Sequence, residues 1–174
     1  ILTLILSFAC LGFFNNTTNN VFADSIELDS STFETAITSN TAGSYILIED
    51  ITLTDWAAID FTGELDGNGF TLTVDNNLFN DISGATISNL GLILSETIIF
   101  DNSENNLGTN FGIFAQNCYD CVIDNCFVQG NINVIAKATT RVGGFIGQCS
   151  NSTIQNCYNI SHVSVTQTFG EALY

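Results

Sequence analysis

Two stretches in the second half of the chain repeat the same order of residue types. Phe111–Gln116 (FGIFAQ) resembles Gly143–Gln148 (GGFIGQ) at an offset of 32 in the numbering, and Val122–Phe127 (VIDNCF) resembles Thr153–Tyr158 (TIQNCY) at an offset of 31. We therefore expect a one-residue insertion between the two matches. Self-similarity at a fixed period indicates a repeat architecture, in which each unit buries its apolar side chains against its neighbours.

A weaker third copy lies upstream. Leu78–Phe79 matches Ile113–Phe114 at an offset of 35, and Thr86–Leu90 matches Val122–Cys126 at an offset of 36. These matches place three repeats at about 76–107, 108–140 and 141–174. We expect the small insertions to fall between the strands, where extra residues are tolerated.

Short segments rich in β-branched and aromatic residues fill the chain after Asp24, which is typical of β-strands. The chain has no proline, so its turns depend on Gly and Asn, which adopt positive φ at the least cost. One helix is predicted over Ser31–Ser39, capped by Ser30 or Ser31. The sequence predicts an all-β fold with strands over residues 45–48, 51–54, 70–74, 86–94, 97–100, 122–128 and 132–135.

Three strand-like segments in one repeat are what one coil of a β-solenoid needs. Equivalent strands of successive coils then pair in parallel, about 4.8 Å apart. We expect a right-handed parallel β-helix of about four coils over 45–174, preceded by an N-terminal cap segment over 24–44. Asparagines recur at equivalent positions of the repeats. They either hydrogen-bond from one coil to the next or serve only to form turns. Three files of equivalent residues are expected: Ile87, Ile123 and Ile154; Leu90, Cys126 and Cys157; and Asn89, Asn125 and Asn156.

Four of the six cysteines occupy equivalent positions in two repeats. Cys118 aligns with Cys149, and Cys126 aligns with Cys157. Stacked equivalents lie at a Cα spacing that a disulfide tolerates, so these are two candidate disulfide pairs. In reduced form they would pack as small apolar residues. Cys118 and Cys121 have the spacing of a zinc-binding pair, but Cys149 and Cys157 do not supply the second pair that a zinc site needs.

An almost unbroken apolar run covers Ile1–Phe14, and the small residues Val21 and Ala23 shortly precede Asp24. The run is shorter than the roughly 20 residues of a membrane-spanning helix. This order is typical of an export signal. We expect a signal peptide over 1–23, truncated at its start, and a secreted chain that begins near Asp24. A buried N-terminal strand or helix and a lipoprotein anchor at Cys10 are the alternatives.

The charge balance narrows the range of partners. The chain has 18 acidic residues, two basic residues and a formal net charge of −16. Nucleic acids and anionic membranes are bound through Lys and Arg, so neither is expected as a partner. We also expect no membrane insertion of the mature segment. Calcium is compatible with a secreted acidic protein, but no spaced set of ligands supports it, and we expect no cofactor.

The segment Gly144-Phe145-Ile146-Gly147, followed by Ser152–Tyr158 (STIQNCY), resembles the GLUG repeat. That repeat is named after a Gly-hydrophobic-hydrophobic-Gly core and occurs in bacterial surface proteins and in streptococcal immunoglobulin A peptidases. The copy at Gly112–Ala115 departs from the pattern, because alanine replaces the last glycine. Gly63–Leu72 (GELDGNGFTL) resembles the first-coil segment of right-handed, pectin lyase-like parallel β-helix proteins. The resemblance implies this fold and a bacterial or archaeal cell surface, and the scaffold carries both enzymes and adhesins.

The resemblance implies that an enzyme on this scaffold would use either a Lys or Arg base or a cluster of aspartates with histidine. Here Lys137 and Arg141 lie in the loop between two repeats, and His162 stands at an ordinary strand start. The aspartates do not recur as a pair in adjacent coils, and Asp66–Gly69 (DGNG) indicates a tight turn. We therefore assign no catalytic residue, no cofactor-binding residue and no metal ligand.

These observations favour the non-catalytic repeat region of a secreted or cell-surface, adhesin-like protein. Such a region binds an extracellular glycan or protein, or acts as a stalk. Two alternatives stay open: a carbohydrate-active enzyme whose catalytic coils lie outside this chain, and a spacer attached to a surface peptidase. One further period after Val142 falls on Tyr174, so we expect the next repeat to begin there and the chain to be truncated.

Overall fold

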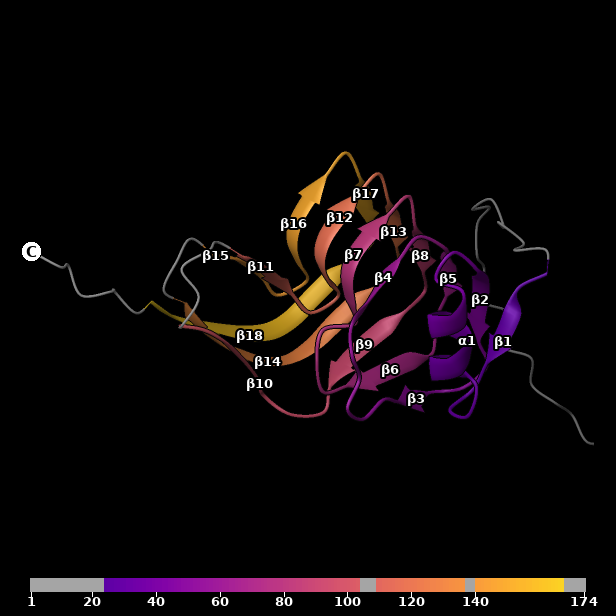
Figure 1. Ribbon diagram of the computed structural model, residues 1–174, viewed down its shortest axis with the longest axis horizontal. Coiled ribbons are helices and arrows are strands. Elements are labelled where there is room, and N and C mark those ends of the chain that lie inside the picture. The colour runs from indigo at the N-terminus through magenta and orange to yellow at the C-terminus, as the bar shows by residue number, and fades with distance from the viewer. Residues whose placement is uncertain (1–23, 104–108, 137–139, 168–174) are drawn as a thin grey trace, which may run out of the picture.

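The computed structural model describes residues 24–103, 109–136 and 140–167. The predicted signal peptide and Lys137 lie outside these residues. The chain is all-β, as predicted, and its paired strands run parallel to each other. The described residues contain one helix, α1 (Phe33–Ser39), which lies beside the first strands in Figure 1.

The strands form three long sheets and one separate pair (Figure 1). Sheet A contains, in order, β1 (Ile26–Leu28), β2 (Ser44–Leu47), β5 (Glu64–Asp66), β8 (Thr86–Ser88), β13 (Val122–Asp124) and β17 (Thr153–Gln155). Sheet B contains β3 (Ile51–Thr52), β6 (Thr71–Val74), β9 (Gly91–Leu94), β14 (Phe127–Ala136) and β10 (Ile98–Asn102), with β18 (Tyr158–Gln167) on the other edge of β14. Sheet C contains β4 (Ile59–Phe61), β7 (Phe79–Ser83), β12 (Ala115–Tyr119) and β16 (Ile146–Ser150), and the separate pair is β11 (Thr109–Gly112) with β15 (Thr140–Gly143).

From β2 onward the chain passes through sheets A, B and C in the same order each time. We call the chain from one sheet A strand to the next a unit. Along sheet A, Leu65 pairs with Tyr45 and Ile87, and Ile123 pairs with Ile87 and Ile154. The first four of these side chains are fully buried, whereas Ile154 is 42% exposed because no described strand lies beyond it. The apolar core therefore runs along the inside of the three sheets.

The register of the last two units corrects the predicted insertion. Every residue pair between these two units keeps the same offset of 31. The pairs run from Thr109 with Thr140, through Asn110 with Arg141, to Ala136 with Gln167. Phe114 therefore lies over Phe145, and their rings stack at 4.7 Å with an interplanar angle of 10°. Matching residue types in the sequence aligned Phe114 with Ile146, at an offset of 32. Packing in the structure instead aligns the rings of Phe114 and Phe145. The predicted offset of 35 is also wrong, because Phe79 pairs with Ala115 at an offset of 36.

Sheet A has six strands, whereas about four coils were expected. The offsets between paired residues are 19 (Ile26 to Tyr45), 20 (Tyr45 to Leu65) and 22 (Leu65 to Ile87), followed by 36 and 31. A search at the period of the late repeats does not detect the shorter units. The predicted cap segment over 24–44 thus contains β1, which starts sheet A.

The additional residues of the later units all lie between sheet B and sheet C. The short connection 75–78 joins β6 to β7, whereas the much longer stretch 95–114 separates β9 from β12 and contains β10 and β11. We call β10, β11, β15 and the second halves of β14 and β18 the arm. Phe100 of β10 stacks on Phe111 of β11 at 4.5 Å, which joins the two layers of the arm. The arm extends from the sheets toward the left of Figure 1.

Residues with positive φ form two corners of each later unit, and they divide the predicted strands over 86–94 and 122–128 in two. Asn and Asp tolerate this conformation because their short polar side chains bond locally. The corner between sheets C and A is formed by Gly84, Asp120 and Asn151, and the corner between sheets A and B by Asn89, Asn125 and Asn156.

Helix α1 begins two residues later than predicted, and neither Ser30 nor Ser31 caps it. Its N-cap is Thr32, whose side chain makes no capping hydrogen bond. The carboxylate of Asp29 instead accepts hydrogen bonds from the backbone N–H groups of Ser31 (2.9 Å) and Thr32 (3.0 Å). Hydrogen bonds from the hydroxyl groups of Ser31 and Thr32, together with these two backbone bonds, lower the pKa of Asp29. The helix buries Phe33 and Ile37 against the first units.

Candidate binding surface on sheet C

Polar side chains line the outer face of sheet C in one file. Asn117 pairs with Asp81 on one side and with Gln148 on the other. The Asn117 side-chain amide donates to Oδ1 of Asp81 at 2.6 Å, and the backbone N–H of Asp81 donates to Oδ1 of Asp60 at 3.2 Å. We call Asp60, Asp81, Asn117 and Gln148 the polar ladder. Phe79, Ile82, Ala115 and Cys118 of the same strands are buried.

The arm adds a cation to one end of the polar ladder. Asn110 pairs with Arg141 in the β11–β15 pair. The Asn110 amide donates to Oδ1 of Asn117 at 2.6 Å and to Oε1 of Gln148 at 3.0 Å. Nη1 of Arg141 lies 3.4 Å from both Oδ1 of Asn110 and Oε1 of Gln148. Arg141 is exposed and is the only arginine of the chain.

This surface was missed in the sequence. Asp81, Asn117 and Gln148 recur at offsets of 36 and 31, which are the offsets of the strand register. That recurrence is the signal that would have found them, but their residue types differ and a search for matching letters passes over them. Arg141, interpreted from the sequence as part of a loop, lies on strand β15.

The other basic and acidic candidates lie apart from the ladder. His162 pairs with Asn131 on the exposed side of β18. Several aspartates of the early units hold the backbone of a neighbouring unit. Asp50 accepts from the N–H of Thr71 at 2.7 Å, and Asp75 accepts from the N–H of Asp55 at 2.6 Å. In the predicted turn, Asp66 accepts from the N–H of Asn68 at 2.8 Å, and Asn68 has positive φ.

The three asparagines at the corner between sheets A and B share one backbone conformation. The amide of Asn125 donates to Oδ1 of Asn89 at 2.8 Å, and the amide of Asn89 donates to Oδ1 of Asp66 at 3.0 Å. Asn156 donates to Asp124 at 2.7 Å and not to Asn125. The asparagines therefore contribute both to the turns and to contacts between units. Leu90 and Cys126 follow these corners and are buried.

The predicted cysteine partners lie in adjacent units, and the five cysteines of the described residues are free thiols. Cys118 pairs with Cys149, and the N–H of Cys126 donates to the sulfur of Cys157 at 3.4 Å. Burial raises the pKa of Cys118 to about 12. A hydrogen bond between the side chains of Cys126 and Cys157, together with burial, raises the pKa of Cys126. The hydrogen bond from Cys126 lowers the pKa of Cys157 to about 7, so Cys157 is the more reactive thiol of that pair.

Cys121 lies apart from both pairs. It is buried, its sulfur donates to the carbonyl oxygen of Tyr119 at 3.0 Å, and its N–H donates to Oγ of Ser152 at 3.0 Å. Within the part of the chain that the structure describes, no group of three or more His, Cys, Asp or Glu side chains is arranged to hold a metal ion.

The glycines of the predicted motif lie where the arm meets sheet C. A Cβ atom on Gly147 would come within 2.7 Å of the backbone nitrogen of Phe111. A Cβ atom on Gly144 would collide with Nδ2 of Asn159. The motif therefore permits the close approach of neighbouring segments, and Gly147 permits a backbone contact that no side chain can relieve.

The comparisons with known proteins add no relative. No protein-family model, no curated protein and no solved structure matches the chain. Among the residues described, no helix is long and apolar enough to cross a membrane.

Proposed function

We propose that the chain is a parallel β-helix and the non-catalytic, ligand-binding repeat region of a secreted or cell-surface, adhesin-like protein. The repeated passage through sheets A, B and C, with equivalent residues paired in parallel, supports the β-helix. The proposed ligand is an extended glycan that lies along the polar ladder. The observation that carries the proposal is the line of amide and carboxylate groups across neighbouring strands of sheet C.

The chemistry of the polar ladder suits sugar hydroxyl groups. Amide groups donate and accept hydrogen bonds, and carboxylates accept them. Neighbouring strands are about 4.8 Å apart, so the ladder offers such groups at regular intervals along one direction. An extended polymer with hydroxyl groups at regular intervals matches that arrangement better than a compact ligand does. Arg141 at one end adds a donor for an acidic or strongly polar sugar substituent.

The role of the carboxylates supports binding over catalysis. Asp81 accepts the Asn117 amide, and Asp60 accepts the backbone N–H of Asp81. Both carboxylates thus take part in a hydrogen-bonded file and hold neighbouring groups in place. We propose that they orient the amides that contact the ligand.

A glycan array, followed by calorimetric titration with any glycan that binds, tests the proposal. The double variant Asn117→Ala/Gln148→Ala should weaken binding about tenfold or more, because two hydrogen-bonding side chains are lost. The matched control is Asn131→Ala/Asn133→Ala, which removes two exposed asparagines from the outer face of β14 and should leave binding unchanged.

Binding to no glycan, or equal losses in both double variants, would contradict a ligand on the polar ladder. Cleavage of a polysaccharide by the chain would overturn the non-catalytic role. An experimental structure in which Ile87, Ile123 and Ile154 lie on unrelated sheets would overturn the β-helix.

A further inference from the structure

A hollow of about 430 Å³ lies where the arm begins, between two units in the middle of the chain. We call this hollow the arm notch. It is lined by Asp75 and Asn76, which follow β6, and by Glu96, Thr97, Ile98 and Ile99, which lead into β10. Both units have described neighbours on either side along sheet A, so the exposure of the arm notch does not depend on where the sequence begins or ends.

The arm notch exists because β6 ends where the chain after β9 continues along sheet B. The last pair between β6 and β9 is Val74 with Leu94, and the N–H of Ser95 still donates to the carbonyl oxygen of Val74 at 2.9 Å. Beyond this point the chain after β6 turns to sheet C, whereas the chain after β9 continues as β10. Residues 127–129 of β14 pair with β9, and residues 132–136 pair with β10. A strand that continued the line of β6 would therefore lie beside β10.

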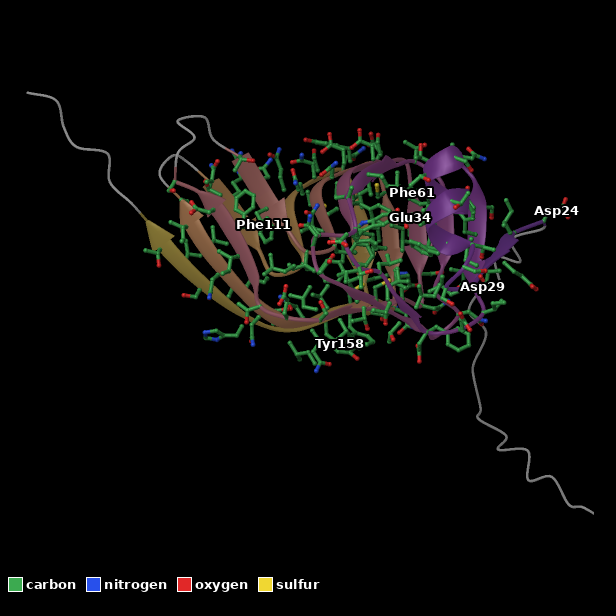
Figure 2. All side chains as sticks on the ribbon, turned by 60° about the horizontal axis from the view of Figure 1, so that its bottom comes forward. Asp24, Asp29, Glu34, Phe61, Phe111 and Tyr158 are labelled. Carbon is green, nitrogen blue, oxygen red and sulfur yellow. The ribbon has the colours of Figure 1, made fainter. Side chains whose placement is uncertain are left out.

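The edge of β10 that borders the arm notch is unpaired in the described structure, where β10 pairs with β14 alone. The early units have no arm, so none of their described strands fills this place. Figure 2 shows Phe111 in the arm, apart from Phe61 in the early units. An unpaired edge offers backbone N–H and C=O groups to an extended segment. Strand β10 is therefore a template for one additional strand.

The side chains of β10 alternate between the two faces of sheet B. Ile98 and Asn102 are buried and Phe100 is half-buried. Ile99 and Asp101 lie on the other face and are exposed, Ile99 by 67%. Successive side chains of a strand point to opposite faces, so an added strand would place one set beside Phe100 and the other beside Ile99 and Asp101. The first set meets an apolar ring, whereas the second set lies near solvent and a carboxylate.

The groups around the arm notch are acidic, and none of the residues that line it is basic. Asp75 and Glu96 lie in its walls, and Asp101 follows on β10. The carboxylate of Asp75 is held in place because it accepts a hydrogen bond from the N–H of Asp55 at 2.6 Å. Seventeen of the 18 acidic residues of the chain lie at or before Asp124, whereas both basic residues come later. Such surroundings attract lysine and arginine side chains.

The charge also decides against two other occupants of the arm notch. A second copy of the chain, with its net charge of −16, would bring the same carboxylates to the same edge. Residues 1–23 of this chain contain no charged side chain, so they would leave the acidic groups of the notch without a cation. A separate, basic and extended peptide is the occupant that suits both the edge and the charge.

We propose that the arm notch binds an extended segment of another protein in which apolar residues alternate with lysine or arginine. The segment pairs with the free edge of β10 through its backbone. Its apolar side chains cover the face beside Phe100, and its basic side chains lie beside Glu96 and Asp101. The inference is independent of the proposed glycan binding, which uses the outer face of sheet C.

Calorimetric titration of the full chain with a capped peptide of alternating lysine and valine tests the proposal. One-to-one binding is expected. A peptide of the same composition, with its lysines and valines in two separate blocks, should bind at least about tenfold more weakly, because it cannot present the two sets of side chains to opposite faces. Two further peptides keep the alternating sequence and carry N-methyl groups on alternate residues, in opposite phases. At least one of them should lose about tenfold in affinity, because its N–H groups no longer reach the edge of β10.

The variant Glu96→Lys should weaken binding of the alternating peptide about tenfold, because a repulsion replaces an attraction in the arm notch. The matched control is Glu27→Lys, which makes the same change at an exposed position of β1 and should bind the peptide like the unchanged chain. The double variant Asn117→Ala/Gln148→Ala should also bind it normally, which separates this site from the polar ladder.

Amide hydrogen exchange gives a second readout. Exchange over residues 98–102 should slow when the peptide binds, whereas exchange over β1 should stay the same. Circular dichroism should show that the charge variants keep the β-sheet spectrum. If Glu96→Lys fails to fold, Thr97→Lys provides the same test, because Thr97 is also exposed in the notch.

Four results would each overturn the proposal. The first is no binding of the alternating peptide, and the second is equal binding of the alternating and block peptides. The third is full binding of both N-methylated peptides or unchanged exchange over residues 98–102. The fourth is an equal loss of affinity in Glu96→Lys and Glu27→Lys, which would show attraction by the net charge alone.

Discussion

The early and late units use the same three sheets, but they differ in length, and a helix packs only against the early ones. From Ile26 to Ile87 the offsets along sheet A are only 19 to 22, and α1 packs against these units. From Ile87 to Ile154 the two offsets are 36 and 31, and the additional chain forms the arm. The sheet A file ends on an exposed isoleucine in both regions, Ile26 (49%) in the early one and Ile154 (42%) in the late one.

The comparison shows that the core tolerates additional chain at one corner without any change in the pairing of the sheets. The arm enters between sheets B and C, while residues at the corner between sheets A and B keep the same positive φ in successive units. A long insertion at an exposed connection costs little, because loop-closure entropy grows slowly with loop length. Core packing, in contrast, is sensitive to single methylene groups.

The largest expected difference lies within the isoleucine and leucine file of sheet A, between its fully buried members in both regions and its exposed last member. Leu65→Ala and Ile123→Ala should each lower the free energy of unfolding by about 2–5 kcal/mol, because both side chains are fully buried. Ile154→Ala should lower it by less than about 1 kcal/mol in dilute solution. Urea denaturation measures all three, and equal losses would contradict the exposed position of Ile154.

The second expected difference is that oxidation should stabilise only the late units, because the cysteines of the described residues lie only there. Oxidised glutathione should join Cys118 to Cys149 and Cys126 to Cys157, with two thiols oxidised for each glutathione disulfide reduced. Each bridge closes a loop about as long as one late unit and should raise the free energy of unfolding by about 4 kcal/mol. Urea denaturation with and without reductant measures the change.

Peptide mapping by mass spectrometry identifies the linked cysteines, and Cys121 should not appear in either bridge. The variant Cys149→Ala should retain the Cys126 bridge and lose the other. Failure to form either bridge in the folded chain would show that the paired thiols are too far apart or misaligned.

A smaller effect is expected where the arm crosses sheet C. Gly147→Ala places a Cβ atom against the backbone of Phe111 and should lower the free energy of unfolding by about 1–3 kcal/mol. The neighbouring variant Gln148→Ala removes a half-buried side chain that accepts a hydrogen bond from Asn110, and should lower the free energy of unfolding by no more than about 1 kcal/mol. Thermal or urea unfolding compares the two, and a harmless Gly147→Ala would disprove the close contact.

The smallest effect concerns two aspartates, one in each region. Hydrogen bonds lower the pKa of both Asp29 and Asp101. Their contribution to stability is therefore present above the pKa of the unfolded chain and lost as the pH falls through the lower pKa of the folded chain. Asp29→Asn should flatten the acid side of the stability profile more than Asp101→Asn. Asp29 holds the start of α1, whereas within the described residues Asp101 bonds only to Ser103.

Unfolding midpoints measured at a series of pH values below neutral give the two profiles. The same profile in Asp29→Asn and in the unchanged chain would show that the hydrogen bonds of Asp29 do not stabilise the helix start.

The sequence predicted the all-β class and most strand positions, because alternating apolar residues and Asn or Gly punctuation are local signals. It also placed Cys118 with Cys149 and Cys126 with Cys157 in adjacent repeats. It misaligned Phe114 by one residue, because a match of residue types does not show which side chains stack. It missed the early units, because their shorter steps along sheet A carry no repeated motif.

By itself, then, the sequence determined the type of secondary structure, the order of the strands and the uneven distribution of acidic residues. The tertiary structure alone decided the common register of the last two units, the polar ladder and the exposure of Ile154. The physical reason is that burial and pairing are properties of neighbouring units. Asp81, Asn117 and Gln148 are far apart in the chain and become one surface only when their strands lie side by side.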